Sequence, residues 1–343
     1  MPNLNVDTYQ FDFSGGGGVP EGYTYIVDSD QALNNWLHGI SGNDYTHVFI
    51  APGRWSIDYA QVETIKYLDD VSIGTKTITG VPGSVICDDD NDYTDLYDGF
   101  AILKYQTLPT KDYFIKGITF EFKKVMVYNS SDGYFTILSK CINIINCNIL
   151  SISTRPSCSA PIACAYACTN ISNCTFSTGY ASTVTGGQGH IDAVQNCINI
   201  YNCIFNIINE AQNDASPSDN SFTFVSGCIN IYNCVMFGEL DSKLTRDSMP
   251  SGFWGCKNIN NVIVYNAADY GDSIGMCAQV NNCIALFFGD NTAMSHCCGY
   301  TIDQYGYMSL AVAKSYRDYA DHSRTVAAAN NSAGGWNWVT SRY

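Results

Sequence analysis

Acidic side chains gather in three segments that follow the most regular parts of this sequence. His190 and Asp192 lie in the first segment, Glu210 in the second and Glu239 in the third. Hydrolysis of a glycosidic bond requires two carboxyl groups about 5–9.5 Å apart, so Asp192, Glu210 and Glu239, together with the neighbouring His190, are the candidate catalytic residues. Asp, Ser, Asn and Pro are also the ordinary residues of solvated loops, and no spacing singles out one pair. The sequence therefore indicates carboxylate chemistry without defining an active site.

The densest acidic cluster is the stretch DDDNDYTDLYDG, which begins at Asp88. Asp88, Asp90 and Asp92 offer the hard oxygen ligands that Ca²⁺ prefers. However, Tyr93 stands where an EF-hand loop requires Gly, and Gly99 stands where it requires Glu. We therefore expect an acidic loop without a bound ion and a protein without a cofactor, with Ca²⁺ as the alternative.

One heptapeptide accounts for the regularity of the chain. The stretch CINIYNC occurs at Cys197–Cys203 and again at Cys228–Cys234, and variants of it bring the number of copies to six. Successive copies begin 27, 29, 31, 28 and 21 residues apart. Self-similarity at such a period is typical of solenoids. We therefore predict an all-β solenoid with coils of about 27–31 residues.

Each copy predicts a corner, a short strand with an inward-facing β-branched residue, and a second corner. Asn is a poor strand former, but it tolerates the left-handed αL conformation that turns a strand sharply. Stacked coils would align equivalent asparagines into a ladder of side-chain hydrogen bonds. The second asparagine is present in all six copies. The predicted ladder consists of Asn146, Asn173, Asn202, Asn233, Asn261 and Asn282.

The chain has 16 cysteines, and most of them lie in the repeats. The second cysteine of the heptapeptide is replaced by Val262 in the fifth copy, so this position is used for apolar volume. Free Cys is among the most buried residue types. The sequence contains no CxxC pair, which is the spacing typical of a zinc site. We predict packed, unpaired thiols, with disulfides or a metal site as alternatives. The first cysteines, predicted to form a ladder, are Cys141, Cys168, Cys197, Cys228, Cys256 and Cys277.

The C-x-N-I-x-N-C pattern resembles the coils of right-handed parallel β-helix proteins of the pectin-lyase-like class. The resemblance covers Tyr23 to about Cys298 and implies one coil per repeat, with neighbouring strands about 4.8 Å apart. Such folds host polysaccharide lyases, glycoside hydrolases, phage tail spikes and adhesins, so the resemblance implies a fold rather than a function. The stretch GGQGHID resembles loops of polygalacturonase-like enzymes, but it lacks their paired Asp residues, so that activity is not implied.

The sequence divides into three predicted segments. Residues 1–18 form a flexible arm that ends in four glycines, residues 19–300 form the β-helix, and residues 301–343 add C-terminal strands or a cap. A helix near 28–40 is expected to cover the first coil, whose strand edges would otherwise be open. Its apolar face would consist of Ala32, Leu33, Trp36, Leu37 and Ile40.

The arm alternates along VDTYQFDF, with Tyr9, Phe11 and Phe13 on one face. An alternating strand on a glycine tether is typical of a segment that pairs with something outside its own domain. We predict that the arm docks on a partner, either another subunit of a virion or surface appendage or a neighbouring copy in a homo-oligomer such as a trimer. The alternative is a disordered leader.

Composition narrows the choice of partners. The net charge is −15, with 32 acidic against 17 basic residues, which argues against nucleic acid. No apolar run is long enough to span a bilayer, and the beginning of the chain does not resemble a conventional secretory signal. The 24 tyrosines suit stacking on sugars or docking of a partner, although many are expected to fill corners of the coil.

Two classes of function follow. The first is a non-catalytic β-helix with a structural or receptor- or glycan-binding role, located on a virion or an extracellular surface, most directly as a phage head or tail fibre component. Synthesis without a signal peptide, followed by release through lysis, would explain reduced thiols. The alternative is a carbohydrate-active enzyme of the pectin-lyase-like class, either a polysaccharide lyase or a glycoside hydrolase.

Overall fold

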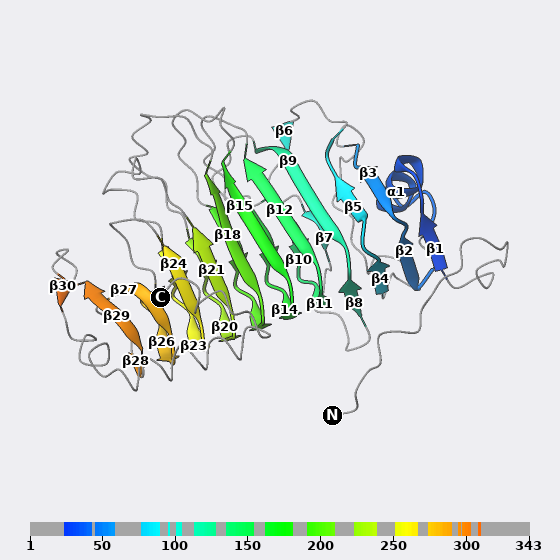
Figure 1. The fold of residues 1–343 in the computed structure, drawn as a ribbon. Coiled ribbons are helices and arrows are strands. Elements are labelled where there is room, and N and C mark those ends of the chain that lie inside the picture. Colours follow the sequence, from blue (N-terminus) through cyan, green and yellow to red (C-terminus); the bar gives the residue numbers. More distant parts are fainter. Residues whose placement is uncertain are drawn as a thin grey trace, which may run out of the picture.

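The repeats fold as a right-handed parallel β-helix, as the sequence predicts (Figure 1). In this computed structural model, equivalent residues of successive heptapeptides lie in register, so that Ile144 pairs with Ile171 and Ile171 with Ile200. The structure describes residues 24–42, 45–58, 77–89, 95–96, 101–104, 113–127, 135–153, 162–180, 191–209, 223–238, 251–266, 274–289, 294–295, 297–302 and 308–309. The predicted arm with Tyr9, Phe11 and Phe13 lies outside these residues, as does most of 301–343.

Three stacks of parallel strands form the walls of the solenoid. The first stack, which we call sheet A, contains the heptapeptide strands and has eleven members. Its strands are β1 (Thr24–Val27), β2 (His47–Ile50), β4 (Thr77–Gly80), β8 (Phe114–Lys116), β11 (Ile142–Ile145), β14 (Thr169–Ser172), β17 (Ile198–Tyr201), β20 (Ile229–Tyr232), β23 (Lys257–Asn260), β26 (Ala278–Asn281) and β28 (Met294–Ser295).

Sheet B follows sheet A in each coil. Its strands are β3 (Gly53–Ser56), β5 (Ser84–Cys87), β9 (Thr119–Val127), β12 (Asn148–Ser153), β15 (Thr175–Tyr180), β18 (Ile204–Asn209), β21 (Val235–Gly238), β24 (Ile263–Asn266), β27 (Ile284–Gly289) and β29 (Cys298–Ile302). The short strand β30 (Met308–Ser309) pairs antiparallel with β29, and β6 (Asp95–Leu96) pairs with the end of β9.

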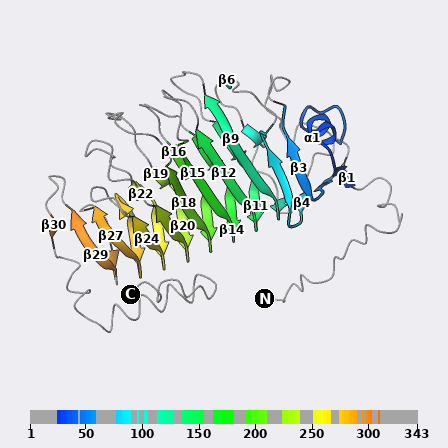
Figure 2. The same ribbon diagram turned by 45° about the horizontal axis from the view of Figure 1, so that its top comes forward.

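Sheet C completes each coil and comes into view in Figure 2, where β16, β19 and β22 are labelled. Its strands are β7 (Ala101–Lys104), β10 (Phe135–Ser139), β13 (Ile162–Tyr166), β16 (Ile191–Gln195), β19 (Thr223–Ser226), β22 (Ser251–Trp254) and β25 (Ile274–Gly275). Sheets B and C are linked by pairing between β25 and β27.

In each heptapeptide coil, three left-handed residues produce the corners. Both asparagines of the heptapeptide adopt positive φ, for example 62° at Asn199 and 54° at Asn202, as the sequence predicts. A third such residue, which the sequence does not reveal, precedes the first cysteine of each copy. This position is Gly in two copies, Gly227 and Gly255, but Ala167 has a φ of 53°. Such a conformation is unusual for a residue with a Cβ, so the stacked neighbours must impose it.

The cysteines line the interior of the solenoid. The 14 cysteines whose side chains the structure describes are all free and buried, in agreement with the prediction of packed thiols. Each thiol of the ladder donates to a carbonyl two residues earlier, as Cys197 does to Gln195 at 3.3 Å. The main-chain N–H of Cys168 donates in turn to Cys197 Sγ at 3.2 Å. Burial raises the pKa of the Cys164 thiol, so this thiol stays neutral.

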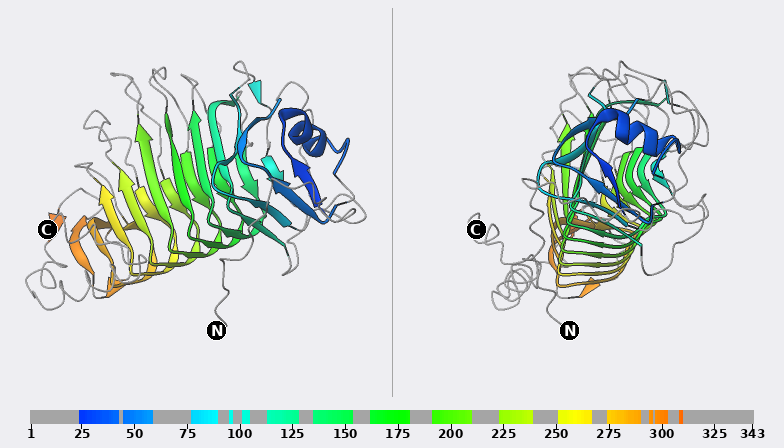
Figure 3. Two further views of the ribbon diagram at one scale, coloured as in Figure 1. Left: turned by 45° about the vertical axis from the view of Figure 1, so that its right-hand side comes forward. Right: turned by 90° about the vertical axis from the view of Figure 1, so that its right-hand side faces the viewer.

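The helix α1 (Asp30–Leu37) closes the first coil at the N-terminal end of the solenoid (Figure 3). Ser29 Oγ caps it by accepting from Ala32 N. Leu33, Trp36 and Leu37 are buried, whereas Ile40 lies beyond the helix and is 70% exposed. Polar side chains of α1 also form hydrogen bonds with the main chain of the edge strand β3.

Those polar contacts replace the hydrogen bonds that a preceding strand would make. Asp30 Oδ1 accepts from Ser56 N at 2.6 Å, and Asn34 Nδ2 donates to Ser56 O at 3.0 Å. Asn34 Oδ1 also accepts from Asp58 N at 2.9 Å. Because an unpaired strand edge invites aggregation, the helix protects the chain here, as the sequence predicts.

Candidate functional site

The predicted catalytic residues His190, Glu210 and Glu239 belong to segments that follow neighbouring strands of sheet B in the sequence. The ends of β12, β15 and β18 are in register, with Ser153 beside Tyr180 and Tyr180 beside Asn209. His190, Glu210 and Glu239 themselves lie outside the described residues. Asp192 is described and is fully buried on β16, in register with Ala163. The proposed catalytic pairs therefore stay predictions.

The acidic cluster at Asp88 begins with two carboxylates that bind protein groups. Asp88 is buried and accepts from Lys123 N at 2.9 Å, while Asp89 binds Arg54. Asp90 and Asp92 lie outside the described residues. In the part of the chain that the structure describes, no group of three His, Cys, Asp or Glu residues could hold a metal ion.

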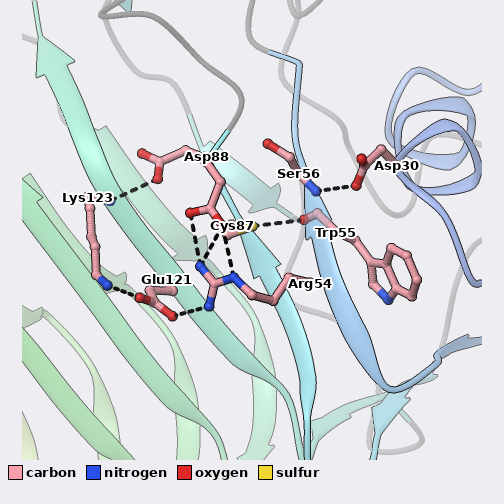
Figure 4. A network of polar contacts seen from close by, with 9 residues as sticks. Asp30, Arg54, Trp55, Ser56, Cys87, Asp88, Glu121 and Lys123 are labelled. Atoms are coloured by element: carbon pink, nitrogen blue, oxygen red, sulfur yellow. Dashed lines mark hydrogen bonds and ion pairs between the residues drawn. The ribbon is translucent and has the colours of Figure 1, made fainter.

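A charged network crosses the outer surface of β3, β5 and β9 (Figure 4). Arg54 forms a bidentate pair with Asp89 at 2.9 Å and donates to Glu121 Oε2 at 2.8 Å. Lys123 forms an ion pair with the other oxygen of Glu121. Burial alone would raise the pKa of Glu121, but hydrogen bonds from Lys123 and Arg54 hold the pKa below its usual value. Since each of these charges has an opposite partner, the network joins coils rather than offering a charge to a ligand.

The outer face of sheet A differs in charge from the rest of this acidic protein. None of its eleven described strands contains Asp or Glu, although the whole chain carries a net charge of −15. The lysines Lys116 and Lys257 lie on β8 and β23. This face is therefore neutral to weakly basic, and it would not repel a neutral or anionic ligand.

Large side chains concentrate on two adjacent strands of this face. Ile198 and Ile229 are each 40% exposed and lie in register on β17 and β20. Next to them Tyr201, which is 37% exposed, is in register with Tyr232. The two tyrosine rings have centroids 5.3 Å apart and planes 8° apart, so they stack along the axis of the solenoid. Aromatic faces bind sugars and other rings by this kind of contact.

Two asparagine ladders flank these tyrosines. The inner ladder, which is part-buried, is formed by the first asparagine of each heptapeptide, and Asn199 Nδ2 donates to Asn170 Oδ1 at 2.9 Å. The outer ladder is formed by the second asparagine. Here Asn202 donates to Asn173 and Asn233 donates to Asn202, both at 3.2 Å. The inner ladder consists of Asn143, Asn170, Asn199, Asn230 and Asn258.

The outer ladder places an amide beside each tyrosine. Tyr201, Asn202, Tyr232 and Asn233 form what we call the tyrosine–asparagine strip. Each ladder amide uses one N–H along the stack, which leaves further donor and acceptor capacity for a ligand. The bond from Asn258 Nδ2 to the Tyr232 hydroxyl, 2.5 Å, fixes one end of the strip.

Sequence reasoning did not single out Tyr201 and Tyr232 as a site. The signal was nevertheless present, because CINIYNC is the one heptapeptide that occurs twice without change. Stacking of identical copies necessarily places its tyrosines side by side. The tyrosines expected in loops lie outside the heptapeptide, so the repeat does not predict their neighbours.

Comparison with protein-family models, with curated proteins and with solved structures finds no match to this chain. Among the described residues, no helix has the length and apolar character needed to cross a membrane.

Proposed function

We propose that this protein is a non-catalytic β-helix of an extracellular appendage, such as a phage head or tail fibre, and that it binds a glycan through the tyrosine–asparagine strip. The observation that carries this proposal is the parallel pair formed by exposed Tyr201 and half-buried Tyr232, beside a row of side-chain amides. Aromatic rings supply apolar contact to the C–H face of a sugar, and amides supply hydrogen bonds to its hydroxyls.

The charge of sheet A supports binding by this face. Its strands carry no carboxylate in the described structure, so a glycan laid on them would meet amides, hydroxyls and two lysines. Glycosidic cleavage by the usual route needs two carboxyl groups at the bond, and the strip does not provide them.

The interior supports the proposed location. Fourteen free, buried thiols suit a protein that folds in a reducing compartment and is released afterwards. Strands in register along the solenoid also make a stiff rod, which suits a fibre or spike.

Binding is tested with immobilised oligosaccharides and the full-length protein. The double variant Tyr201→Ala/Tyr232→Ala is expected to lose about tenfold to hundredfold in affinity, because the stacked pair that supplies the aromatic surface is removed. Trp254→Ala is the matched control, since Trp254 is similarly exposed at 38% but lies on sheet C. Wild-type protein that binds no glycan, or a double variant that binds as wild type does, would overturn the proposal.

The same oligosaccharides test for catalysis. We expect neither new reducing ends nor unsaturated products. Turnover that is abolished by Asp192→Asn, Glu210→Gln or Glu239→Gln would instead favour the lyase or hydrolase alternative.

The arm is tested by deletion. Removal of residues 1–18 is expected to leave the β-helix folded and to abolish self-association or incorporation into a particle, because the alternating segment with Tyr9, Phe11 and Phe13 is the proposed docking strand. Sedimentation of the truncated and full-length chains measures this. Equal assembly of the two would reduce the arm to a leader.

A further inference from the structure

The stacked tyrosines belong to a single column of outward-facing residues on sheet A. Register places Ile145, Ser172, Tyr201, Tyr232 and Asn260 side by side on consecutive strands. Ser172 has the smallest side chain of the five. The column is therefore interrupted at β14, immediately before the aromatic pair.

The two ends of the tyrosine pair differ. At the β23 end, Asn258 donates to the Tyr232 hydroxyl and Asn260 donates to Asn258 at 2.9 Å, so a network of amides adjoins that ring. At the β14 end, Tyr201 adjoins only the short side chain of Ser172 in its column. The face of Tyr201 that is turned away from Tyr232 is thus the less covered aromatic face.

The interruption has the dimensions of one ring. Ile145 and Tyr201 are two strands apart, which corresponds to about 9.6 Å between their backbones. The neighbouring pair shows that each ring of the column occupies one strand spacing, since the centroids of Tyr201 and Tyr232 are 5.3 Å apart. A ring placed over Ser172 would continue the stack, between Tyr201 and Ile145.

The residues around the interruption favour a sugar over an apolar side chain. β14 presents Thr169 and Ser172, and exposed Asn173 follows directly. An aromatic or aliphatic side chain laid there would cover these hydroxyls without hydrogen-bonding them, which is unfavourable. A pyranose ring can place its C–H face on Tyr201 and its hydroxyls on Ser172, Thr169 and the amide.

We propose that one pyranose ring of a glycan occupies the position above Ser172, stacked on Tyr201, and that the small size of Ser172 determines binding. This inference rests on the proposed function, and it assigns the orientation of the sugar ring, whose plane is parallel to the tyrosine rings and therefore lies across the solenoid axis.

The test is to fill the interruption with a residue that the chain already tolerates. Ser172→Tyr converts the strand TNIS into TNIY, and tyrosine occupies the same position in the next two coils. The variant is expected to fold as wild type does and to lose about tenfold or more in affinity for the oligosaccharide that wild type binds best. Asn260→Tyr is the matched control, because it extends the same column at its other end, and it is expected to retain affinity.

A second variant separates the effect of the size of residue 172 from the effect of its hydroxyl group. Ser172→Ala keeps the space and is expected to bind more tightly than Ser172→Tyr. Circular dichroism and thermal melting verify folding of each variant. If wild type binds a glycan but Ser172→Tyr binds it equally well, or if Asn260→Tyr loses binding instead, the inference is overturned while the proposed function stands. If wild type binds none of the oligosaccharides, the proposed function itself fails.

Discussion

The first coils and the heptapeptide coils solve the same architectural problem by different means. In the first coils, individual contacts between unlike residues hold the strands, such as Asn34 on Ser56 and Arg54 on Asp89 and Glu121. In the later coils, the same contact recurs between identical residues, as in the ladders of asparagine and cysteine. A single substitution should therefore act locally in the first region, whereas in the second it interrupts a series.

The largest effect is expected where the first region depends on one side chain. Trp36 is fully buried between α1 and the first coil. Trp36→Ala should cost about 3–5 kcal/mol, because it leaves a cavity that no repeated neighbour can fill. Hydrogen exchange should show β1, β2 and α1 opening while β14 to β23 stay protected. Equal loss of protection in both regions would remove the distinction between them.

A smaller effect should separate Cys197 and Cys234, which belong to the two cysteine columns of the heptapeptide. In the first column, Cys197 Sγ accepts the main-chain N–H of Cys168. In the second column, Cys174 accepts such a bond from Cys147 N at 3.4 Å, whereas Cys234 accepts none among the described contacts and donates to Tyr232 O. Cys197→Val should therefore cost about 1–3 kcal/mol by leaving a buried N–H unsatisfied.

The control for this experiment is Cys234→Val. It should cost less than about 1.5 kcal/mol, because it conserves apolar volume and the chain itself has Val262 in that column. Chemical denaturation of both variants measures the difference. If the two substitutions lower stability by the same amount, the Cys197 thiol contributes only apolar volume.

The asparagine ladders should differ by burial. Glycine tolerates positive φ, so Asn199→Gly and Asn202→Gly remove the amide with little corner strain. Asn199 belongs to the part-buried ladder, and its loss should cost about 1–2 kcal/mol. Asn202 is exposed, so its loss should cost about 0.5 kcal/mol or less. Thermal melting with the order reversed would contradict this assignment.

The smallest effect concerns pH in the first region. His47 Nε2 lies 2.6 Å from Thr79 Oγ1, and burial lowers the pKa of the imidazole from about 6.5. Because the folded pKa is depressed, the contribution to stability is present above about pH 6.5 and is lost as the pH falls through the folded pKa. Melting of wild type should therefore shift more between pH 7.5 and 5.5 than melting of His47→Gln. An identical shift would assign the pH dependence to other groups.

The difference between the two regions also explains what the sequence could predict. The coils, the left-handed asparagines and the packed thiols could be predicted because the same residue types recur at the same positions in successive heptapeptides. The network of Arg54 joins residues 35 and 67 positions apart and leaves no periodic trace. The left-handed position before the first cysteine was hidden because Lys140, Ala167 and Met276 carry no signal for it.

The candidate site shows the same limit. The tyrosines could be read from the repeated CINIYNC, but their parallel stacking and the interruption at Ser172 depend on register between coils. The inner asparagine ladder was also missed as a unit, because its last copy has Gln279 in place of asparagine. The outer ladder was predicted because its position is asparagine in every copy. In the structure it is nevertheless the more exposed of the two ladders.

The inner ladder also has a direction. Every amide donates toward the previous coil, so the series needs a first acceptor and a last donor that are not part of it. Asn143 donates to the carbonyl of Tyr113 at one end, and Asn260 donates to Asn258 at the other. At each terminus the last contact is thus made with a group outside the ladder. A coil inserted or removed between these two ends would lengthen or shorten the ladder by one amide and would leave both end contacts in place.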